Sequence, residues 1–441
     1  MNKNGLARIV LFSAAALLAA CSDSTNKIGS TVKGERISAL EAAKMLEADK
    51  GLKDSKPTLP HSIVNFSWSQ AGYDSEHAMP YAEVSAHPKM VWEQSIGEGS
   101  DSDFKLLAHP VIEHGVIYTM DAQGLVTARN AKTGDKNWEF DTTPKDSEDA
   151  AIGGGLAVDG GTLYATTGFG DVLALDAKNG AVKWKKALLK PLRAAPTVAD
   201  NRIYVVSIDN DLNALDAKTG DSLWHQSGIA EAATLMGASN PAVSGDNVIA
   251  AYNSGEIFDL RVQNGRVLWD YSLAAPAQVG ALPAIADIRG LPVIDHGVVY
   301  AISHSGRMAA IDQRSGDRLW EADIGGIDTP VVAGDAVFLY GGNGQLIALA
   351  RDSGRAMWVS DLPQKVDPKD KDSDRLVWSG PVLAGERLWM VNSAGKLASF
   401  SLNDGSALDS IDVGGAIYLP PIVADRTLYV VTDEGNLVAL R

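Results

Sequence analysis

The residue most clearly placed for covalent chemistry is Cys21, the single cysteine among 441 residues. It follows Ile9 to Ala20, an apolar run of about a dozen residues that is too short to span a bilayer as a stable helix. Lys3 and Arg8 give the chain a positive start, and the residues directly before Cys21 are small enough for the cleft of a signal peptidase. We therefore expect residues 1–20 to be a signal peptide that is cleaved before Cys21.

The residues around Cys21 also indicate how the thiol is used. Leu18, three residues before it, completes a pattern that resembles the bacterial lipobox, which implies acylation of the Cys21 sulfur. Several acyl chains on one residue give durable anchoring, where a single chain is marginal. Ser22 favours sorting to the outer membrane, so we expect a lipid-anchored protein that faces the periplasm. The alternative is an ordinary secretory signal with a chance cysteine.

No other residues have the spacing of a catalytic or metal site. The eight histidines, among them His109, His114 and His304, form neither His-x-His nor His-Glu-x-x-His, so we expect no bound metal. The glycines at 153–155 lack the Lys-Ser/Thr that completes a phosphate loop. The formal net charge of −16 makes nucleic acid an unsuitable partner, because phosphate-binding proteins usually present a basic face.

A repeat dominates the rest of the chain. Asp176 to Gly180, followed by Trp184, recurs as Asp216 to Gly220, followed by Trp224. The aspartate can begin a turn, and the glycine can take positive φ at low steric cost. The next strand then carries a tryptophan, which buries a large area between neighbouring sheets. Complete units end at Trp138, Trp184, Trp224, Trp269, Trp320 and Trp358.

Two incomplete units show how the repeat array ends. In the seventh copy, at 402–405, Asp409 stands at the tryptophan position, and the eighth copy stops at Leu440-Arg441. The missing part stands at the other end, as Met90-Val91-Trp92. The spacing of the units is near the roughly 40–50 residues of a four-stranded propeller blade. We predict that residues 88–441 form an all-β, eight-bladed propeller of four-stranded antiparallel blades, closed by the N-terminal strand. Seven blades and an open β-solenoid are the alternatives.

The region before the propeller is expected to have three parts. Residues 21–34 are polar and aperiodic, which is typical of a flexible tether. Residues 35–87 form an N-terminal extension that begins with one short amphipathic helix over Ile37–Leu46. The extension continues as a strap on the first or last blade, because Trp68 to Gly72 resembles the segment ahead of some quinoprotein-like propellers. His77 is interpreted as structural.

The repeat, the lipobox-like start and the eight-fold count together resemble the family of the outer-membrane protein assembly factor BamB. The resemblance covers roughly residues 88–441 and is strongest around Asp287 to Trp320. It implies a non-catalytic lipoprotein scaffold of the outer-membrane β-barrel assembly machinery. Such a scaffold binds the periplasmic transport domains of the central barrel subunit, as a monomer within a hetero-complex, and aids insertion of β-barrel proteins. Unfolded outer-membrane proteins are a second implied partner.

The resemblance also implies where the partner binds. In that family the main contacts lie on two neighbouring loops, one with a Leu-x-Leu-Arg-Gly pattern and the other with Asp-x-Asp. The first pattern aligns with residues 233–237, where Leu235 matches and Met236 departs. In the second, Asp287 matches and Arg289 replaces an acid. We therefore take Leu235, Met236, Asp287 and Arg289 as the candidate partner-binding residues.

Two other functional classes are compatible with the repeat. A pyrroloquinoline quinone dehydrogenase shares it, but needs a Ca²⁺ held by oxygen ligands, a catalytic aspartate and often a vicinal disulfide. A chain with one cysteine cannot form that disulfide, and no aspartate falls in a recognisable catalytic motif. We therefore expect no catalysis and no cofactor. A generic periplasmic scaffold for another envelope complex is the third possibility.

Overall fold

The computed structural model describes residues 46–52, 55–145, 151–231, 234–274 and 285–441. In these residues the chain is all-β, with thirty-two strands and no helix, and therefore no helix able to cross a membrane. Cys21, the tether and the helix expected over Ile37–Leu46 lie outside the described residues, except for Leu46, which is not helical.

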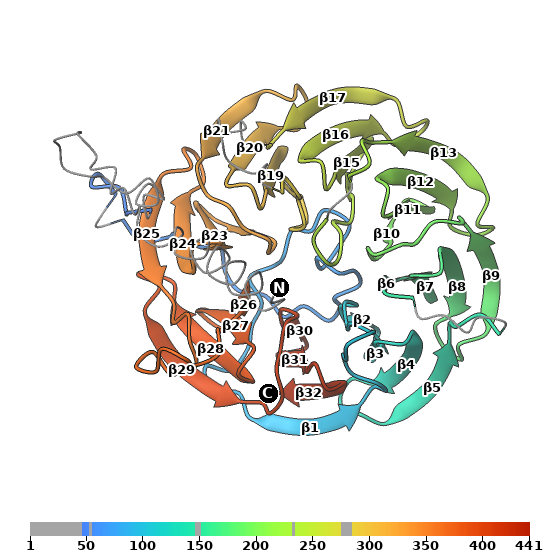
Figure 1. Cartoon of the computed structure of the whole chain (residues 1–441), viewed down its shortest axis with the longest axis horizontal. Helices are drawn as coiled ribbons and strands as arrows, with labels where there is room; N and C mark the ends of the chain where they lie inside the picture. Colours follow the sequence, from blue (N-terminus) through green and yellow to red (C-terminus); the bar gives the residue numbers. More distant parts are fainter. Residues whose placement is uncertain (1–45, 53–54, 146–150, 232–233, 275–284) are drawn as a thin grey trace, which may run out of the picture. The chain divides into compact units, whose positions relative to one another are not determined.

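The strands form eight four-stranded antiparallel blades around a central axis (Figure 1), as predicted. The first four blades are β2–β5 (Val111–Glu113, Val116–Met120, Leu125–Asn130, Lys136–Asp141), β6–β9 (Gly154–Asp159, Thr162–Thr167, Asp171–Asp176, Val182–Ala187), β10–β13 (Thr197–Ala199, Arg202–Val206, Asp211–Asp216, Ser222–Ser227) and β14–β17 (Ala242–Ser244, Asn247–Ala251, Glu256–Arg261, Val267–Ser272). The last four are β18–β21 (Val293–Asp295, Val298–Ile302, Met308–Asp312, Arg318–Ala322), β22–β25 (Val331–Ala333, Ala336–Gly341, Gln345–Ala350, Ala356–Asp361), β26–β29 (Trp378–Ala384, Arg387–Asn392, Lys396–Ser401, Ala407–Asp412) and β30–β32 with β1 (Ile422–Ala424, Thr427–Val431, Asn436–Leu440, Met90–Ser95).

The two ends of the propeller sequence meet in the eighth blade. Strand β1 pairs antiparallel with β32, with Met90 opposite Leu440 and Ser95 opposite Asn436. The backbones of Lys89 and Arg441 extend this ladder by two further hydrogen bonds, of 2.8 and 2.9 Å. The predicted ring closure through the N-terminal strand is therefore confirmed. It pairs strand edges that an open array would leave exposed.

Each repeated tryptophan packs on the turn of the following blade. The Trp184 indole Nε1 donates a hydrogen bond of 3.1 Å to the carbonyl of Ala217, in the turn that ends at Gly220. Gly220 has a φ of +74°, and a Cβ there would lie 2.7 Å from the Trp184 ring, so both conformation and space require glycine. The same contact joins Trp92–Gly134, Trp138–Gly180, Trp224–Gly265, Trp269–Gly316, Trp320–Gly354 and Trp358–Gly405.

Ring closure explains why Asp409 replaces a tryptophan. The blade that follows Asp409 is the eighth, whose third strand, β32, ends at the chain terminus and whose fourth strand is β1. No turn joins these two strands, so a tryptophan on β29 would have no turn to pack on. Asp409 instead accepts a hydrogen bond of 2.5 Å from the guanidinium of Arg387 on β27, the second strand of the same blade.

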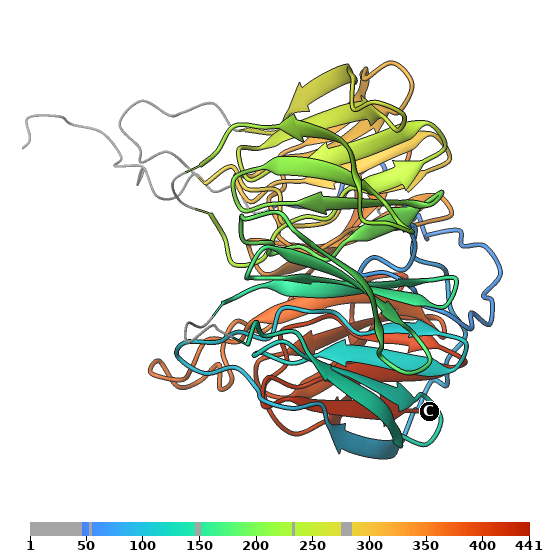
Figure 2. The ribbon, with the colours of Figure 1, turned by 90° about the vertical axis from the view of Figure 1, so that its right-hand side faces the viewer.

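The strap, defined here as the described residues 46–52 and 55–87, crosses one face of the ring (Figures 1 and 2). Sequence patterns predicted that the strap packs on the first or last blade, but it forms hydrogen bonds with all eight blades. Its bonds, by blade from the first to the eighth, are Trp68 N to Ile112 O (2.9 Å), Val158 N to Ser69 O (2.9 Å), Val198 N to Gln70 Oε1 (2.9 Å), Val243 N to Ser75 O (2.6 Å), Ile294 N to Glu76 O (2.9 Å), Asp335 N to Thr58 O (3.2 Å), Ala82 N to Leu383 O (3.3 Å) and Asn65 Nδ2 to Val423 O (2.6 Å).

The innermost strand of each blade has no further strand beside it toward the ring axis. The strap therefore supplies hydrogen-bond partners to backbone groups that would otherwise be unpaired. Two side chains of the strap, those of Trp68 and His77, are themselves buried against the ring. Trp68 is 2% exposed, and His77 is 1% exposed with its Nδ1 2.8 Å from the carbonyl of Pro292. Burial lowers the pKa of His77 to about 4, so the ring is neutral at neutral pH. His77 is a structural residue of the strap.

Candidate functional site

Three loops on the face opposite the strap join blades two to five. Their described residues are 188–196, 228–231 with 234–241, and 273–274 with 285–292. In Figure 2 this face lies at left while the strap lies at right, in blue. Each loop runs from the outer strand of one blade to the inner strand of the next, and so enters from the outer rim and ends near the axis. The two predicted partner-binding segments lie on the second and third loops.

Hydrogen bonds tie the three loops together through two intervening turns. The N–H of Ile208 donates to the carbonyl of Pro191 at 3.0 Å, and the Asn210 amide donates to the carbonyl of Ile229 at 2.5 Å. The same amide also lies 2.5 Å from the side chain of Asn253, in the next blade. The loops are therefore held to one another as one surface, although they come from different blades.

Large apolar side chains on these loops are exposed. Leu189 is 89% exposed, Ile229 58%, Met236 44% and Ile285 39%. We call these four residues the apolar loop surface. Leu189 also has a φ of +64°, a conformation that is strained for a residue with a branched side chain. Exposed apolar groups gathered on one face are typical of a protein-binding surface.

Asp287 and Leu235 are brought into direct contact. The backbone N–H of Leu235 donates a hydrogen bond of 2.7 Å to Oδ2 of Asp287, across 52 positions in the sequence. Asp287 is 3% exposed, and burial raises the pKa of its carboxyl group, while the Leu235 N–H lowers it. Asp287 therefore holds the loop that carries Leu235 and Met236, and its carboxylate is not presented to solvent.

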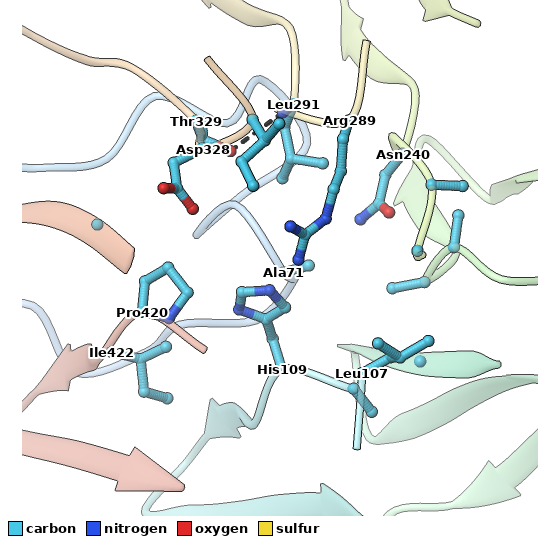
Figure 3. Close-up of a pocket in the computed structure, with 18 of the residues that line it drawn as sticks. Ala71, Leu107, His109, Asn240, Arg289, Leu291, Asp328, Thr329, Pro420 and Ile422 are labelled. Atoms are coloured by element: carbon cyan, nitrogen blue, oxygen red, sulfur yellow. Dashed lines mark hydrogen bonds between the residues drawn. The ribbon is translucent and has the colours of Figure 1, made fainter. Parts of the chain in front are cut away.

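The four predicted partner-binding residues thus occupy different environments. Met236 is exposed, Leu235 is half-buried beside it, and Asp287 lies beneath them. Arg289 points instead into a cavity on the ring axis, toward His109 (Figure 3). The structure therefore groups Met236 and Leu235 with the apolar loop surface, and gives Asp287 a supporting position.

Sequence patterns did not identify Leu189, Ile229 and Ile285. Each stands beside other apolar residues in the sequence, as in Leu188-Leu189, and nothing local distinguishes an exposed side chain from a buried neighbour. A useful signal would have been large apolar residues in segments between the repeat's strands. Within the described residues, no group of three or more His, Cys, Asp or Glu side chains could hold a metal ion.

A family model described as "Outer membrane protein assembly factor BamB" matches residues 122–360 and 342–441, which is most of the propeller. The chain belongs to the BamB family. The BamB of Yersinia pestis is 27% identical over 367 residues, covering 79% of this chain and 88% of the relative. The BamB of Escherichia coli K12 is 26% identical over 369 residues, covering 82% and 91%.

Solved structures agree on the fold. The crystal structure of BamB from Moraxella catarrhalis has a TM-score of 0.68 and 20% identity, and covers 80% of this chain and 100% of that chain. The quinohemoprotein alcohol dehydrogenase of Comamonas testosteroni has a TM-score of 0.64 and 13% identity, covering 85% and 80%. Both likenesses show the architecture alone. Membership of the BamB family, which the sequence match shows, assigns this chain to assembly factors and not to the quinone-dependent dehydrogenases.

Proposed function

We propose that this BamB-family chain is a non-catalytic lipoprotein scaffold of the outer-membrane β-barrel assembly machinery. It binds the periplasmic domains of the central barrel subunit through the apolar loop surface, while Cys21 anchors it to the outer membrane. The observation that carries this proposal is the exposure of four large apolar residues on one face, of which Met236 lies in a segment that aligns with the family's contact patterns.

The form of the surface suits a docking role. Leu189 and Met236 expose apolar area that water disfavours, and burying a side chain of this size is worth about 1.5–3 kcal/mol. Bonds such as that from the Leu235 N–H to Asp287 already hold described residues of these loops in place, so docking costs little further conformational entropy at those residues. A ring of eight closed blades supplies the rigid support.

The direct test is affinity isolation of the tagged, full-length protein from solubilised outer membranes, followed by mass spectrometry. The expected result is recovery of the large β-barrel assembly subunit in near-equal amounts. Recovery of a different envelope complex, with no barrel-assembly subunit, would show the generic periplasmic scaffold instead.

Changing Cys21→Ala is expected to move the protein from the membrane fraction to the soluble periplasmic fraction, because no acyl chain can then be attached. Fractionation and labelling with a fatty-acid probe measure this, and Ser22→Ala is the matched control, which keeps the acylated cysteine. A Cys21→Ala protein that stays in the membrane fraction, together with an unlabelled parent protein, would contradict the lipid anchor.

Changing Asp287→Ala is expected to weaken binding of the central barrel subunit by about fivefold, because the lost hydrogen bond to Leu235 is worth roughly 1 kcal/mol. Asp287→Asn keeps an oxygen acceptor at the same place, and is expected to retain most of the affinity. Binding of the purified partner domain, measured by surface plasmon resonance, distinguishes the two. Equal loss in both variants would show that the partner contacts the carboxylate charge itself.

A further inference from the structure

A cavity of about 90 Å³ lies on the ring axis, several times the ~10–15 Å³ that one water molecule requires. The strap residues Trp68, Ala71 and Met79 line it from one face of the ring. From the other face it is lined by Gly237 and Leu291, which belong to the loops described above. Figure 3 shows His109, Asn240, Arg289 and Asp328 extending into this space from separate segments, each ahead of the inner strand of a different blade.

The cavity is rich in hydrogen-bond donors that have no partner within the described residues. The Asn240 side-chain nitrogen, the Trp68 indole Nε1 and the Arg193 Nε are all buried and unpaired. Asn240 is 3% exposed and Trp68 is 2% exposed, so bulk solvent does not reach them. Buried polar groups in folded proteins are almost always paired, so an unpaired set around one space points to a ligand or to ordered water.

The charges that line the cavity favour an anion. Arg193 and Arg289 supply two guanidinium groups, while Asp328 is the one acid among the described lining residues. Burial raises the pKa of Asp328 to about 7, with Arg289 opposing the shift, so its negative charge is incomplete at neutral pH. Burial, followed by the charge of Arg289, lowers the pKa of His109 to about 4, so the imidazole is neutral. The cavity is therefore locally positive in a chain of formal charge −16.

Apart from Thr329, the remaining side chains of the lining are apolar. They include Leu107, Ile327, Pro420 and Ile422, together with the strap residue Met79. A fully solvated inorganic ion would leave these side chains without contacts, whereas a molecule with a short hydrocarbon part would bury against them. The lining thus combines a donor-rich cationic side with an apolar side.

We propose that the axial cavity is a binding site for a small carboxylate with a short apolar tail, held by Arg193, Arg289 and Asn240. A guanidinium group matches the two oxygens of a carboxylate, and the Asn240 amide adds a further donor. A phosphate dianion fits less well, because the partly ionised Asp328 repels a second negative charge. This site is separate from the apolar loop surface, and the inference does not depend on the proposed function.

The test uses the full-length protein in detergent, with butyrate as the probe and butyramide as its neutral counterpart. Isothermal titration calorimetry is expected to show saturable butyrate binding, at least tenfold tighter than butyramide. Arg289→Gln and Arg193→Gln are each expected to weaken butyrate binding at least tenfold. Arg261→Gln, at an exposed arginine on β16, is the matched control and is expected to bind butyrate as the parent does.

The melting temperatures of two Arg289 variants distinguish loss of the binding site from loss of the fold. Arg289→Lys keeps the positive charge and is expected to bind more tightly than Arg289→Gln, with both variants melting near the parent temperature. Equal binding of butyrate and butyramide would overturn the proposal, as would tighter binding of inorganic phosphate than of butyrate. Absence of butyrate saturation would also overturn it, and would assign the unpaired donors to ordered water.

Discussion

Changing Leu189 and Met236 together to glutamate is expected to weaken binding of the central barrel subunit by at least about tenfold. Both side chains are exposed on the loops that face away from the strap, and docking must bury at least part of their apolar area. Losing even one such burial costs about 1.5–3 kcal/mol, or roughly a tenfold to hundredfold change in the dissociation constant. Surface plasmon resonance with the purified partner domain measures the effect.

The matched control places the same two charges elsewhere on the ring. Leu319 and Leu408 are 53% and 46% exposed, but they lie on outer strands of the blades and not on the three loops. Changing both to glutamate is expected to leave the affinity within about twofold of the parent, since exposed substitutions away from a binding site have small effects. An equal loss of affinity in the two double variants would assign the effect to overall charge and would contradict the assignment of the apolar loop surface.

Changing Trp68→Ala is expected to lower the free energy of unfolding by about 3–5 kcal/mol, the usual cost of emptying a buried tryptophan site. Trp68 is 2% exposed and packs edge-on against Tyr73, at a ring-centroid distance of 5.4 Å. Its backbone pairs with Ile112 of the first blade, so loss of the side chain weakens the strap where it meets that blade. Urea unfolding, followed by tryptophan fluorescence and by circular dichroism, measures the change.

The strap supplies its own control, two residues before Trp68. Phe66 is 68% exposed, so Phe66→Ala removes an aromatic ring from the same segment without opening a cavity. Its free energy of unfolding is expected to stay within about 0.5 kcal/mol of the parent. If Trp68→Ala proves as stable as Phe66→Ala, the strap is not part of the cooperative fold, in spite of its hydrogen bonds to every blade.

The blade architecture was predictable because its signals are local. Asp216 to Gly220 and Trp224 lie within one hairpin, so turn formation, positive φ and the apolar anchor can each be inferred from neighbouring residues. Ring closure followed from the split eighth unit, and β1 pairs with β32 as expected. The reason for Asp409 was not predictable, because it depends on the missing turn of a blade built from both ends of the chain.

The path of the strap could not be inferred, because its contacts are mainly backbone hydrogen bonds that require no particular side chain. Ser69 and Ser75, for example, each meet a blade through a backbone carbonyl. Such an extended segment carries no periodic pattern, so its sequence limits its partners very little. Its course over all eight blades is determined by the unpaired inner strands, which exist only once the ring has formed.

For the candidate site, too, some features could be predicted from the sequence and others depend on the tertiary structure. By itself the sequence determined the type of blade, the closing strand and the loops on which Leu235 and Asp287 stand, because repeats and motifs are contiguous. It favoured eight blades over seven, and the structure shows eight. Only the tertiary structure decided that Asp287 is buried under Leu235, that Leu189 is exposed on another loop of the same face and that Arg289 faces the axial cavity. Burial depends on which segments from different blades meet, and no pattern within one segment records that.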